Sequence, residues 1–244
     1  MDPVAFKVFG IEIMWYSILI TTGVIIGAIL AFREAERVGI GEDNLIDLLL
    51  FAIPLSVIGA RIHYVIFSWD YYGQHPKEIL HFRGGGLAIH GAIIVGVIVA
   101  IVFSKKRGLD FWTIADCCAP SLALGQGIGR WGNYINQEAY GGPTNLPWGI
   151  LIDGVRVHPT FLYESIGDIL IFFFLIWYRK NKREVSGEIF LLYIILYSSI
   201  RFFIEGLRTD SLMLGSIRVA QLISIISIVL GLIYLNVRRK KKHI

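Results

Sequence analysis

Seven runs of about 20 mostly apolar residues constrain the fold of this chain more than any other feature of its sequence. They cover residues 13–32, 45–67, 86–104, 111–128, 159–178, 187–205 and 217–237. A helix of about 20 residues spans the hydrocarbon core of a bilayer, which offers no water to an unpaired backbone group. The sequence therefore predicts an all-α integral membrane protein with about seven transmembrane helices.

The overall composition agrees with a lipid solvent. Hydrophobic residues make up 55% of the chain and charged residues 17%, and the mean hydropathy is +0.63. No polar stretch exceeds a loop of about 30 residues, so we expect one polytopic membrane domain over residues 1–244. The N-terminus lacks the basic n-region and the small-residue cleavage site of a signal peptide, and the first apolar run is long enough to span, so we expect it to stay as a helix.

The distribution of Lys and Arg predicts the orientation. Alternate loops on one side carry fourteen Lys and Arg residues, whereas the other side carries nine. The fourteen are Arg33, Arg37, 105–107, Arg179, Lys180, Lys182, Arg183 and 238–242. By the positive-inside rule, the C-terminus is cytoplasmic and the N-terminus extracytoplasmic. The net charge of +4 thus reports topology first, and we expect no nucleic-acid partner.

This orientation places three polar segments on the extracytoplasmic side, at residues 81–91, 129–158 and 197–210. The longest of them, 129–158, is expected to be the main loop and to form a small extracytoplasmic cap with the shorter loops. It opens with the segment GRWGNYINQEAYGG over residues 129–142. Candidate functional residues are therefore expected on the outer side of the membrane.

In that segment Arg130 offers a planar fork of donors to a phosphate or carboxylate. Asn133, Asn136 and Glu138 can orient either the arginine or a ligand. The alternative is a polar loop whose groups satisfy one another at the membrane surface.

The sixth run carries a line of polar residues. Tyr197, Arg201 and Glu205 are spaced four apart and lie on one helix face, and Arg208 follows one turn later. An intramembrane arginine is costly unless it is paired or faces a polar cavity, so Arg201 is a functional candidate. The alternative is a structural Arg201–Glu205 ion pair. The two interpretations are compatible, because a paired arginine can still bind phosphate.

His90 lies where the third helix is expected to begin, after the glycine-rich segment 84–86. A neutral imidazole at the edge of the bilayer can act as a general base; the alternative is a hydrogen-bonded interfacial residue without a chemical role. Tyr16, Arg61 and His63 stand near the outer ends of their runs and could complete a polar pocket.

Other polar residues are assigned less specific parts. Glu164 and Asp168 form an acidic pair four apart in the fifth run and must find partners or water. Cys117 and Cys118 are adjacent in an apolar run, which suits packing and neither a disulfide framework nor a zinc site. The six histidines have no metal-binding spacing, so we expect no metal and no cofactor.

The segment GRWGNYINQEAYGG closely resembles the signature of the prolipoprotein diacylglyceryl transferases, enzymes of the bacterial inner membrane. The resemblance extends to RGGGLAIHG at 83–91, HPTFLYE at 158–164 and YSSIRFFIEGLR at 197–208, in the order that the family has them. Tyr134 stands where the family often has Phe. The resemblance covers most of the chain.

The resemblance implies an activity: transfer of the diacylglyceryl group of phosphatidylglycerol to the thiol of the lipobox cysteine of an exported prolipoprotein. A thioether forms and glycerol 1-phosphate is released. The implied partners are phosphatidylglycerol, the prolipoprotein signal peptide with its lipobox cysteine, and the lipid bilayer. The implied location is the bacterial cytoplasmic (inner) membrane, with the active site toward the extracytoplasmic side.

The resemblance also implies site residues. The expected catalytic residues are His90, Arg130 and Arg201. The expected substrate-binding residues are Tyr16, Arg130, Asn133, Glu138, Tyr197, Glu205 and Arg208, the last by its position one turn after Glu205.

These assignments agree with the chemistry. A cysteine thiol with an ordinary pKa of about 8.5 is a better nucleophile as thiolate, so a base such as His90 would help. A departing phosphate monoester needs guanidinium groups where water is scarce, which suits Arg130 and Arg201. The acyl chains need a gap between helices at outer-leaflet depth.

Two other function classes use the same residues. A transporter for an anionic solute would use the arginines for binding and would form no covalent product. A receptor or scaffold that only binds exported lipoproteins would keep its role after Arg130→Ala. Because the polar residues gather at the outer edge and not at the midplane, the sequence favours the transferase over the transporter.

Overall fold

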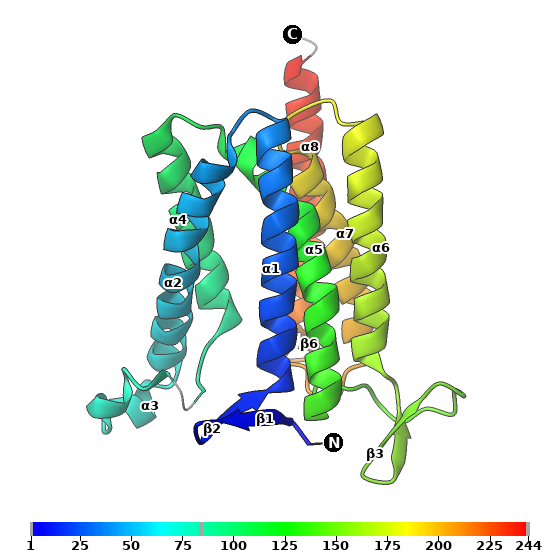
Figure 1. Ribbon diagram of the computed structural model, residues 1–244. Helices are drawn as coiled ribbons and strands as arrows, with labels where there is room; N and C mark the ends of the chain where they lie inside the picture. The colour runs from blue at the N-terminus through cyan, green and yellow to red at the C-terminus, as the bar shows by residue number, and fades with distance from the viewer. Residues whose placement is uncertain (1, 83–84, 243–244) are drawn as a thin grey trace. The chain divides into compact units, whose positions relative to one another are not determined.

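The computed structural model describes residues 2–82 and 85–242, and most of them are helical (Figure 1). The helices are α1 (Trp15–Arg37), α2 (Glu42–Phe67), α3 (Trp69–Tyr72), η1 (Pro76–Glu78), α4 (Ile89–Arg107), α5 (Phe111–Asn136), α6 (Thr160–Asn181), α7 (Glu188–Glu205) and α8 (Val219–Lys242). The strands are β1 (Val4–Val8), β2 (Ile11–Met14), β3 (Ile150–Ile152), β4 (Val155–Val157), β5 (Met213–Leu214) and β6 (Ile217–Arg218).

Five of these helices, α1, α2, α4, α6 and α8, are long and apolar enough to cross a membrane. This confirms a mostly helical, multi-pass membrane protein. α7 is not among them because three charged residues fall within its 18 positions. The count of seven spans and the orientation of the two ends stay predictions.

The strands are short additions to a mostly helical chain, which is consistent with the predicted all-α membrane protein. They form three antiparallel two-stranded hairpins, β1–β2, β3–β4 and β5–β6. Each hairpin is short and lies between or before long helices, where the periodicity of apolar residues carries little information.

Exposed apolar side chains agree with lipid as the solvent. Only 11% of the apolar window of α4 is buried by the protein. Ile93 and Ile98 on that helix are more than half exposed. A soluble protein rarely leaves so continuous an apolar surface open to water.

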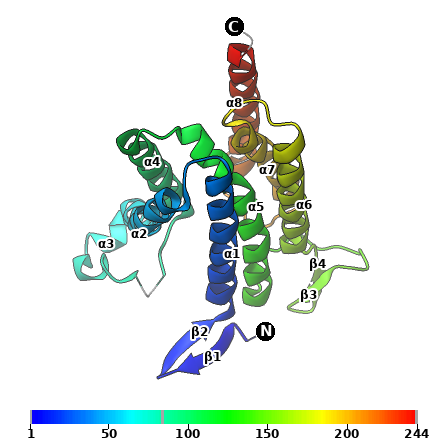
Figure 2. The same ribbon diagram turned by 45° about the horizontal axis from the view of Figure 1, so that its top comes forward.

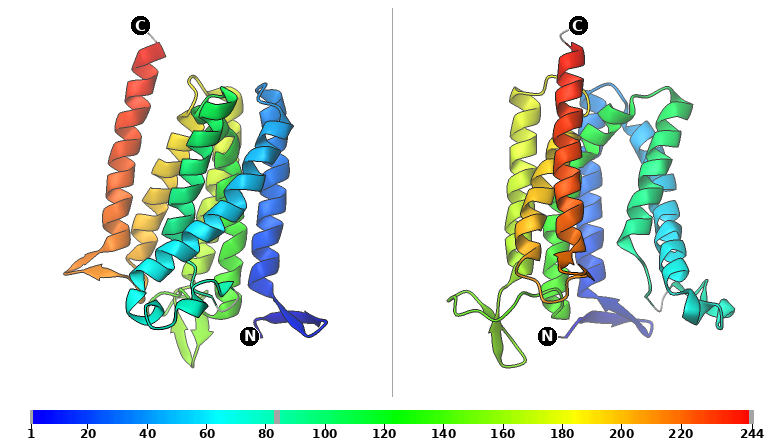
Figure 3. Two further views of the ribbon diagram at one scale, coloured as in Figure 1. Left: turned by 90° about the vertical axis from the view of Figure 1, so that its left-hand side faces the viewer. Right: turned by 180° about the vertical axis from the view of Figure 1, so that it is seen from behind.

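The chain forms two compact units, which we describe separately. The first unit contains the residues up to 31 and from 115 onward, and the second contains 32–114. In the first unit, the long helices α1, α5, α6, α7 and α8 run side by side (Figures 2 and 3). In the second unit, α2 and α4 pack together, and Gly59 and Gly91 allow their backbones to approach closely.

The core of the first unit lies between α5, α6 and α7. The buried residues of this core are Ala119, Ala123, Ile171, Leu175, Ile189 and Tyr193. The small residues on α5 let larger side chains from the other two helices fill the space between them. This packing fixes the three helices that carry the polar residues described below.

Small residues also bring α1 against α5. A Cβ placed on Gly23 would lie 3.2 Å from the Cα of Gly125, and the Ser121 hydroxyl donates to the carbonyl of Gly27 at 2.7 Å. Gly125 therefore allows the two helices to pack closely.

The structure corrects the predicted loop at 129–158. Its first eight residues are helical, because α5 continues to Asn136. Gly129 and Gly132 lie in this helical part and face α1: a Cβ on Gly129 would lie 3.1 Å from Cδ1 of Ile20, and one on Gly132 would collide with the ring of Tyr16. Glycine is tolerated inside a membrane helix when a neighbouring helix packs against it.

Candidate functional site

Backbone hydrogen bonds join three segments that are far apart in the sequence. Gly141 N–H donates to the carbonyl of His158 at 2.9 Å, and His158 N–H donates to Gly142 at 3.0 Å. Gly142 N–H donates to the carbonyl of Leu207 at 2.9 Å. The end of the 129–142 segment, the start of α6 and the end of α7 are therefore held together.

Gly141 stands where these segments meet. A Cβ at this position would lie 2.8 Å from the Cβ of His158 and 2.9 Å from the carbonyl oxygen of Leu207. Both distances are too short for real contacts, so only glycine fits without a shift of the neighbours. The hydroxyl of Thr160 adds a further bond to the carbonyl of Ala139.

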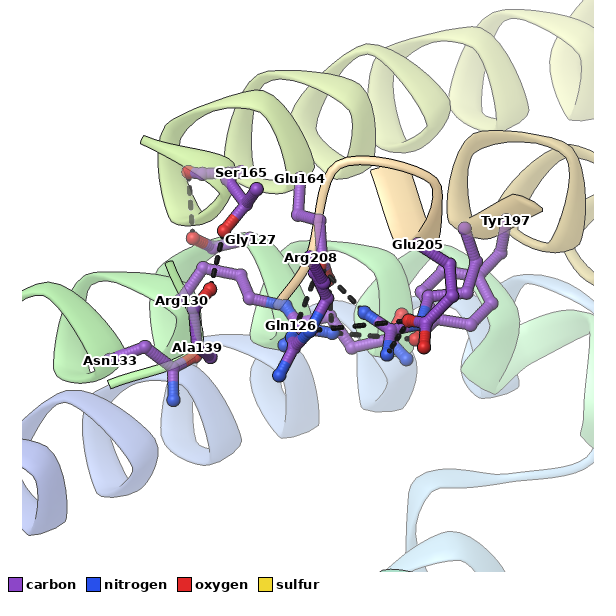
Figure 4. A network of polar contacts seen from close by, with 12 residues as sticks. Gln126, Gly127, Arg130, Asn133, Ala139, Glu164, Ser165, Tyr197, Glu205 and Arg208 are labelled. Carbon is purple, nitrogen blue, oxygen red and sulfur yellow. Dashed lines mark hydrogen bonds and ion pairs between the residues drawn. The ribbon is translucent and has the colours of Figure 1, made fainter. Parts of the chain in front are cut away.

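A network of arginines and carboxylates lies beside this junction (Figure 4). Arg130 from α5 forms an ion pair with Glu164 of α6. Arg201 from α7 donates from Nη1 to Oε1 of Glu164 at 2.8 Å, and its Nη2 lies 2.7 Å from Oε2 of Glu205. Glu164 is thus shared by two arginines from two other helices.

The exposure of these side chains differs by charge. Glu164 and Glu205 are 3% and 2% exposed, whereas the side chains of Arg130 and Arg201 are 21% and 20% exposed. The carboxylates are therefore the buried members of the network, and the arginine side chains are its partly exposed members. A buried carboxylate needs such partners, because an isolated charge is costly away from water.

Arg208 joins the network from the segment after α7. Its Nη1 lies 3.8 Å from Oε1 of Glu164, and its Nε lies 4.0 Å from Oε2 of Glu205. It also donates to both carboxylate oxygens of Asp210, at 2.9 and 2.6 Å. Burial raises the pKa of Asp210, but the hydrogen bonds and charge of Arg208 hold that pKa below its usual value, so Asp210 is ionised.

Tyr197 lies at the edge of the network. Its hydroxyl is 3.5 Å from Nη2 of Arg130. Its ring stacks on that of Tyr193, whose hydroxyl donates to Gln126 of α5 at 2.8 Å. The predicted face of Tyr197, Arg201 and Glu205 is thus brought to Arg130.

The acidic pair of α6 has two different environments. Glu164 found its expected partners. Asp168 is 1% exposed, and neither of its carboxylate oxygens has a hydrogen-bond partner among the described residues. It lies beside Gly127 of α5, within electrostatic range of Arg130.

Asn133 and Glu138 form a separate cluster at the end of α5. Asn133 donates from Nδ2 to Oε1 of Glu138 at 2.9 Å, and Asn136 donates to the same oxygen at 3.3 Å. Glu138 N–H in turn donates to the carbonyl of Asn133 at 3.0 Å. These residues satisfy one another, as one of the two interpretations of the segment expected.

Tyr16 packs on the same helix end. A Cβ on Gly132 would lie 2.2 Å from Cδ2 of Tyr16, so the tyrosine ring occupies the space that this glycine leaves. Tyr16 is 39% exposed. Tyr16 is therefore in contact with the 129–142 segment, and its role in substrate binding stays a prediction.

His90 belongs to the second unit, whereas the arginines belong to the first. It is exposed, lies in the first turn of α4, and its ring centroid is 6.1 Å from that of His63. Of the motif at 83–91, Arg83 and Gly84 lie outside the described residues.

Arg61 has a structural task that the sequence did not reveal. Its buried guanidinium donates to four main-chain carbonyls, those of Glu78, Ile79, Gly85 and Gly86, at 2.6–3.0 Å. This corrects the expectation that Arg61 completes a binding pocket. Its donors instead fix the loop that leads into α4 and His90.

Sequence reasoning also missed the central position of Glu164. It recognised an acid that needed partners, but it did not connect this acid with Arg130 and Arg201. The available signal was a charge balance: buried arginines require a nearby carboxylate, and Glu164 stands in the neighbouring segment at 158–164.

Guanidinium groups that share buried carboxylates and keep an accessible face can bind a phosphate or carboxylate group by bidentate hydrogen bonds. The fold and this network define a polytopic membrane protein with an arginine-based site suited to an anionic ligand.

Comparison with known proteins identifies the family. The model of the prolipoprotein diacylglyceryl transferase family matches residues 3–237. The phosphatidylglycerol–prolipoprotein diacylglyceryl transferase of Finegoldia magna is 56% identical over 244 residues, which cover 100% of this chain and 98% of that protein. The enzymes of that name from Clostridioides difficile and Bacillus mycoides are 54% and 50% identical. Both alignments cover 98% of this chain, with 98% and 93% of the respective relatives.

The chain therefore belongs to the prolipoprotein diacylglyceryl transferase family, and it is a transferase. This confirms the resemblance seen in its sequence motifs.

Proposed function

We propose that this protein transfers the diacylglyceryl group of phosphatidylglycerol to the lipobox cysteine of an exported prolipoprotein. The observation that carries the proposal is the sharing of Glu164 by Arg130 and Arg201, both of which stay partly exposed. Phosphatidylglycerol and prolipoproteins stand in the names of the relatives described above. The network offers the donors that a phosphate group of such a lipid requires.

The reaction replaces one bond to a glycerol carbon by another. The thiolate of the substrate cysteine attacks that carbon, a C–S bond forms, and the C–O bond to phosphate breaks. Glycerol 1-phosphate leaves with the electron pair of that bond. Arg130 and Arg201 stabilise the negative charge that gathers on the departing phosphate.

The carboxylates hold these arginines in position. Glu164 and Glu205 are buried and orient the guanidinium planes before the lipid arrives. Arg208 is bound to the exposed carboxylate of Asp210, so an incoming phosphate can exchange with Asp210 for its donors. Preorganised charges of this kind need little rearrangement during the reaction.

His90 takes the thiol proton in this proposal. It is exposed at the start of α4, and the loop before it is fixed by Arg61. Tyr16, Asn133, Glu138 and Tyr197 contribute to substrate binding: the tyrosines beside the arginines, and the Asn133–Glu138 pair at the end of α5. The substrate supplies the reactive thiol, so Cys117 and Cys118 of α5 need no chemical role.

An apolar cavity supports a path for acyl chains. It has a volume of about 290 Å³ between α7 and α8. Its lining residues are Ser199, Phe202, Phe203, Ile225 and Ile228. Phe202 directly follows Arg201, so a lipid whose phosphate binds the arginines can place a chain against this turn.

The setting completes the proposal. We place the protein in the bacterial cytoplasmic membrane as one polytopic domain with seven spans, an extracytoplasmic N-terminus and a cytoplasmic C-terminus. The arginine network then faces the extracytoplasmic side. The excess of Lys and Arg at the opposite helix ends supports this orientation.

The decisive experiment incubates purified protein with phosphatidylglycerol that is radiolabelled in the acyl chains and with a lipobox peptide. The peptide is used in its cysteine form and in a serine form. Label should reach only the cysteine peptide, and Arg130→Ala should abolish the transfer. Arg156→Gln is the matched control, because Arg156 is an exposed arginine whose side chain donates to a nearby loop carbonyl.

Absence of transfer by a wild-type protein that still binds the lipid would overturn the proposal. Flux of an anionic solute across sealed vesicles would then favour the transporter. Binding of lipoproteins that survives Arg130→Ala would favour the scaffold.

A further inference from the structure

A second polar cluster lies at the other end of the first unit, where α8 passes the turn between α6 and α7 (Figure 1). Arg239 of α8 forms an ion pair with Glu188, the first residue of α7, and donates to the hydroxyl of Tyr178 at 2.7 Å. Arg238 donates from Nη2 to the hydroxyl of Ser186 at 2.9 Å. These contacts fix the end of α8 against the turn.

A cavity of about 380 Å³ opens beside these contacts. It is lined by Val185, Ser186, Tyr234, Val237, Arg238 and Lys241. Four of these residues come from α8 at a spacing of three or four, so they share one face of that helix. The other two come from the turn.

The polarity of the lining changes along α8. Tyr234 is amphipathic and Val237 is apolar, whereas Arg238 and Lys241, which follow them, are positively charged. α8 is long and apolar enough to cross the membrane, and the basic residues come at its end. The cavity therefore crosses the boundary between the hydrocarbon core and the headgroup region, where tyrosine is favoured.

We propose that this cavity binds the headgroup of an anionic phospholipid. The lipid phosphate lies against Arg238 and Lys241, and the start of its acyl chains lies along Tyr234 and Val237. Among the described residues, the lining of the cavity holds two basic side chains and no acidic one, and Glu188 is buried and held by Arg239. Basic residues at a membrane surface attract anionic lipids in this way.

This lipid site is distinct from the arginine network. Glu188 begins α7, whereas Arg201 and Glu205 lie in its last turns. A helix of 18 residues is about 27 Å long, close to the thickness of the hydrocarbon core. The two sites therefore face opposite leaflets, and the lipid at α8 is a bound structural lipid that is not consumed.

Photocrosslinking tests this proposal. The full-length protein carries benzoylphenylalanine in place of Tyr234 and is reconstituted in phosphatidylcholine vesicles. These contain a minor fraction of either radiolabelled phosphatidylserine or radiolabelled phosphatidylcholine. Phosphatidylserine is anionic but is not the proposed transferase substrate, so the result does not depend on the reaction. Phosphatidylserine should be crosslinked in preference to phosphatidylcholine.

Charge removal provides the matched comparison. Lys241→Gln should lower the preference for phosphatidylserine about fivefold. The double variant, Arg238→Gln with Lys241→Gln, should lower this preference about a further fivefold. Lys105→Gln with Lys106→Gln, at the basic end of α4, should leave it unchanged. Because Lys241 is exposed, the single variant keeps the test valid if the double variant does not fold.

Equal crosslinking of the two lipids, or a preference that survives Lys241→Gln, would overturn the proposal. Excess inorganic phosphate should not compete with the lipid. Loss of crosslinking on addition of phosphate alone would contradict a lipid site and indicate a site for a free anion.

Discussion

The two ends of α7 both bury carboxylates beside arginines, but they satisfy those carboxylates in different ways. At the start of α7, Asp116 accepts the main-chain N–H groups of Gly187 and Phe190 at 2.8 and 2.9 Å, and it pairs with Arg183 at 3.0 Å. Glu188 accepts the main-chain N–H of Glu184 at 2.7 Å in addition to its side-chain partners Arg239 and Tyr178. Backbone donors cannot be exchanged for a ligand without local unfolding, so these acids are structural.

At the end of α7 the partners are side chains. The Glu164 carboxylate pairs with Arg130, Arg201 and Arg208, which come from three different segments. Side-chain donors can turn toward a ligand while the backbone stays in place. Burial alone therefore does not distinguish a structural ion pair from a binding site. The kind of donor around the buried acid, main chain or side chain, distinguishes the two better.

The largest effect on folding is expected at the start of α7. Asp116→Ala should lower the free energy of unfolding by about 3–5 kcal/mol, because it removes a buried ion pair and leaves N–H groups without an acceptor. Unfolding of the purified protein in detergent measures this. Asp47→Ala, which removes an exposed ion pair with Arg107, should cost less than about 1 kcal/mol. Equal losses would break the comparison.

The next effect concerns the rate. Arg130→Gln should lower the rate of diacylglyceryl transfer about 10²- to 10³-fold, because a donor to the leaving phosphate is lost. Arg183→Gln should lower stability while the rate per folded molecule stays near that of the wild type. The transfer assay, normalised to folded protein, separates the two. A rate loss in Arg183→Gln as large as that in Arg130→Gln would contradict the division between the two ends.

Within the network, the two acids of α6 should differ. Glu164→Gln should cost about 2 kcal/mol of stability, because it removes the charge shared by the arginines. Asp168→Asn should change stability by less than about 1 kcal/mol, because neither Asp168 oxygen accepts a hydrogen bond from the described residues. Parallel unfolding curves measure both variants. A larger loss in Asp168→Asn would place Asp168 among the supports of the network.

The last comparison concerns two adjacent glycines. Gly141→Ala should cost about 1–3 kcal/mol, because the new methyl group would collide with His158 and the Leu207 carbonyl. Gly142→Ala should change the free energy of unfolding by less than about 0.5 kcal/mol. Apart from the two residues adjacent in sequence, the nearest atom to the new methyl group would be Cγ2 of Thr209, at 4.0 Å. Thermal unfolding of the two variants measures the difference. Equal stability would show that the junction can shift to admit a side chain.

Apolar periodicity predicted the helical regions well, because a lipid solvent imposes a minimum length on each apolar run. Its main error was the boundary of α5. Residues 129–136 were predicted as loop, whereas they are helical and Gly132 among them is a contact point with Tyr16 of α1. That error arose because helix propensity is local, but the benefit of a small residue appears only when a second helix approaches.

The spacing of Tyr197, Arg201 and Glu205 predicted one face of α7, and the Arg201–Glu205 ion pair agrees with it. The meeting of that face with Arg130, and the use of Glu164 as their shared carboxylate, had no local signal. Arg61 was misassigned for the same reason, since its four carbonyl partners lie in a loop 17–25 residues away.

By itself, the sequence determined the solvent of this protein, the positions of its long helices, its family motifs and the residue types that meet a phosphate. Tertiary structure alone decided which acid pairs with which arginine, which glycines cannot be replaced by a larger residue, and which charged side chains stay partly exposed. The physical reason is that length, hydropathy and helical spacing act along the chain, whereas ion pairs and steric limits act between segments that only folding brings together.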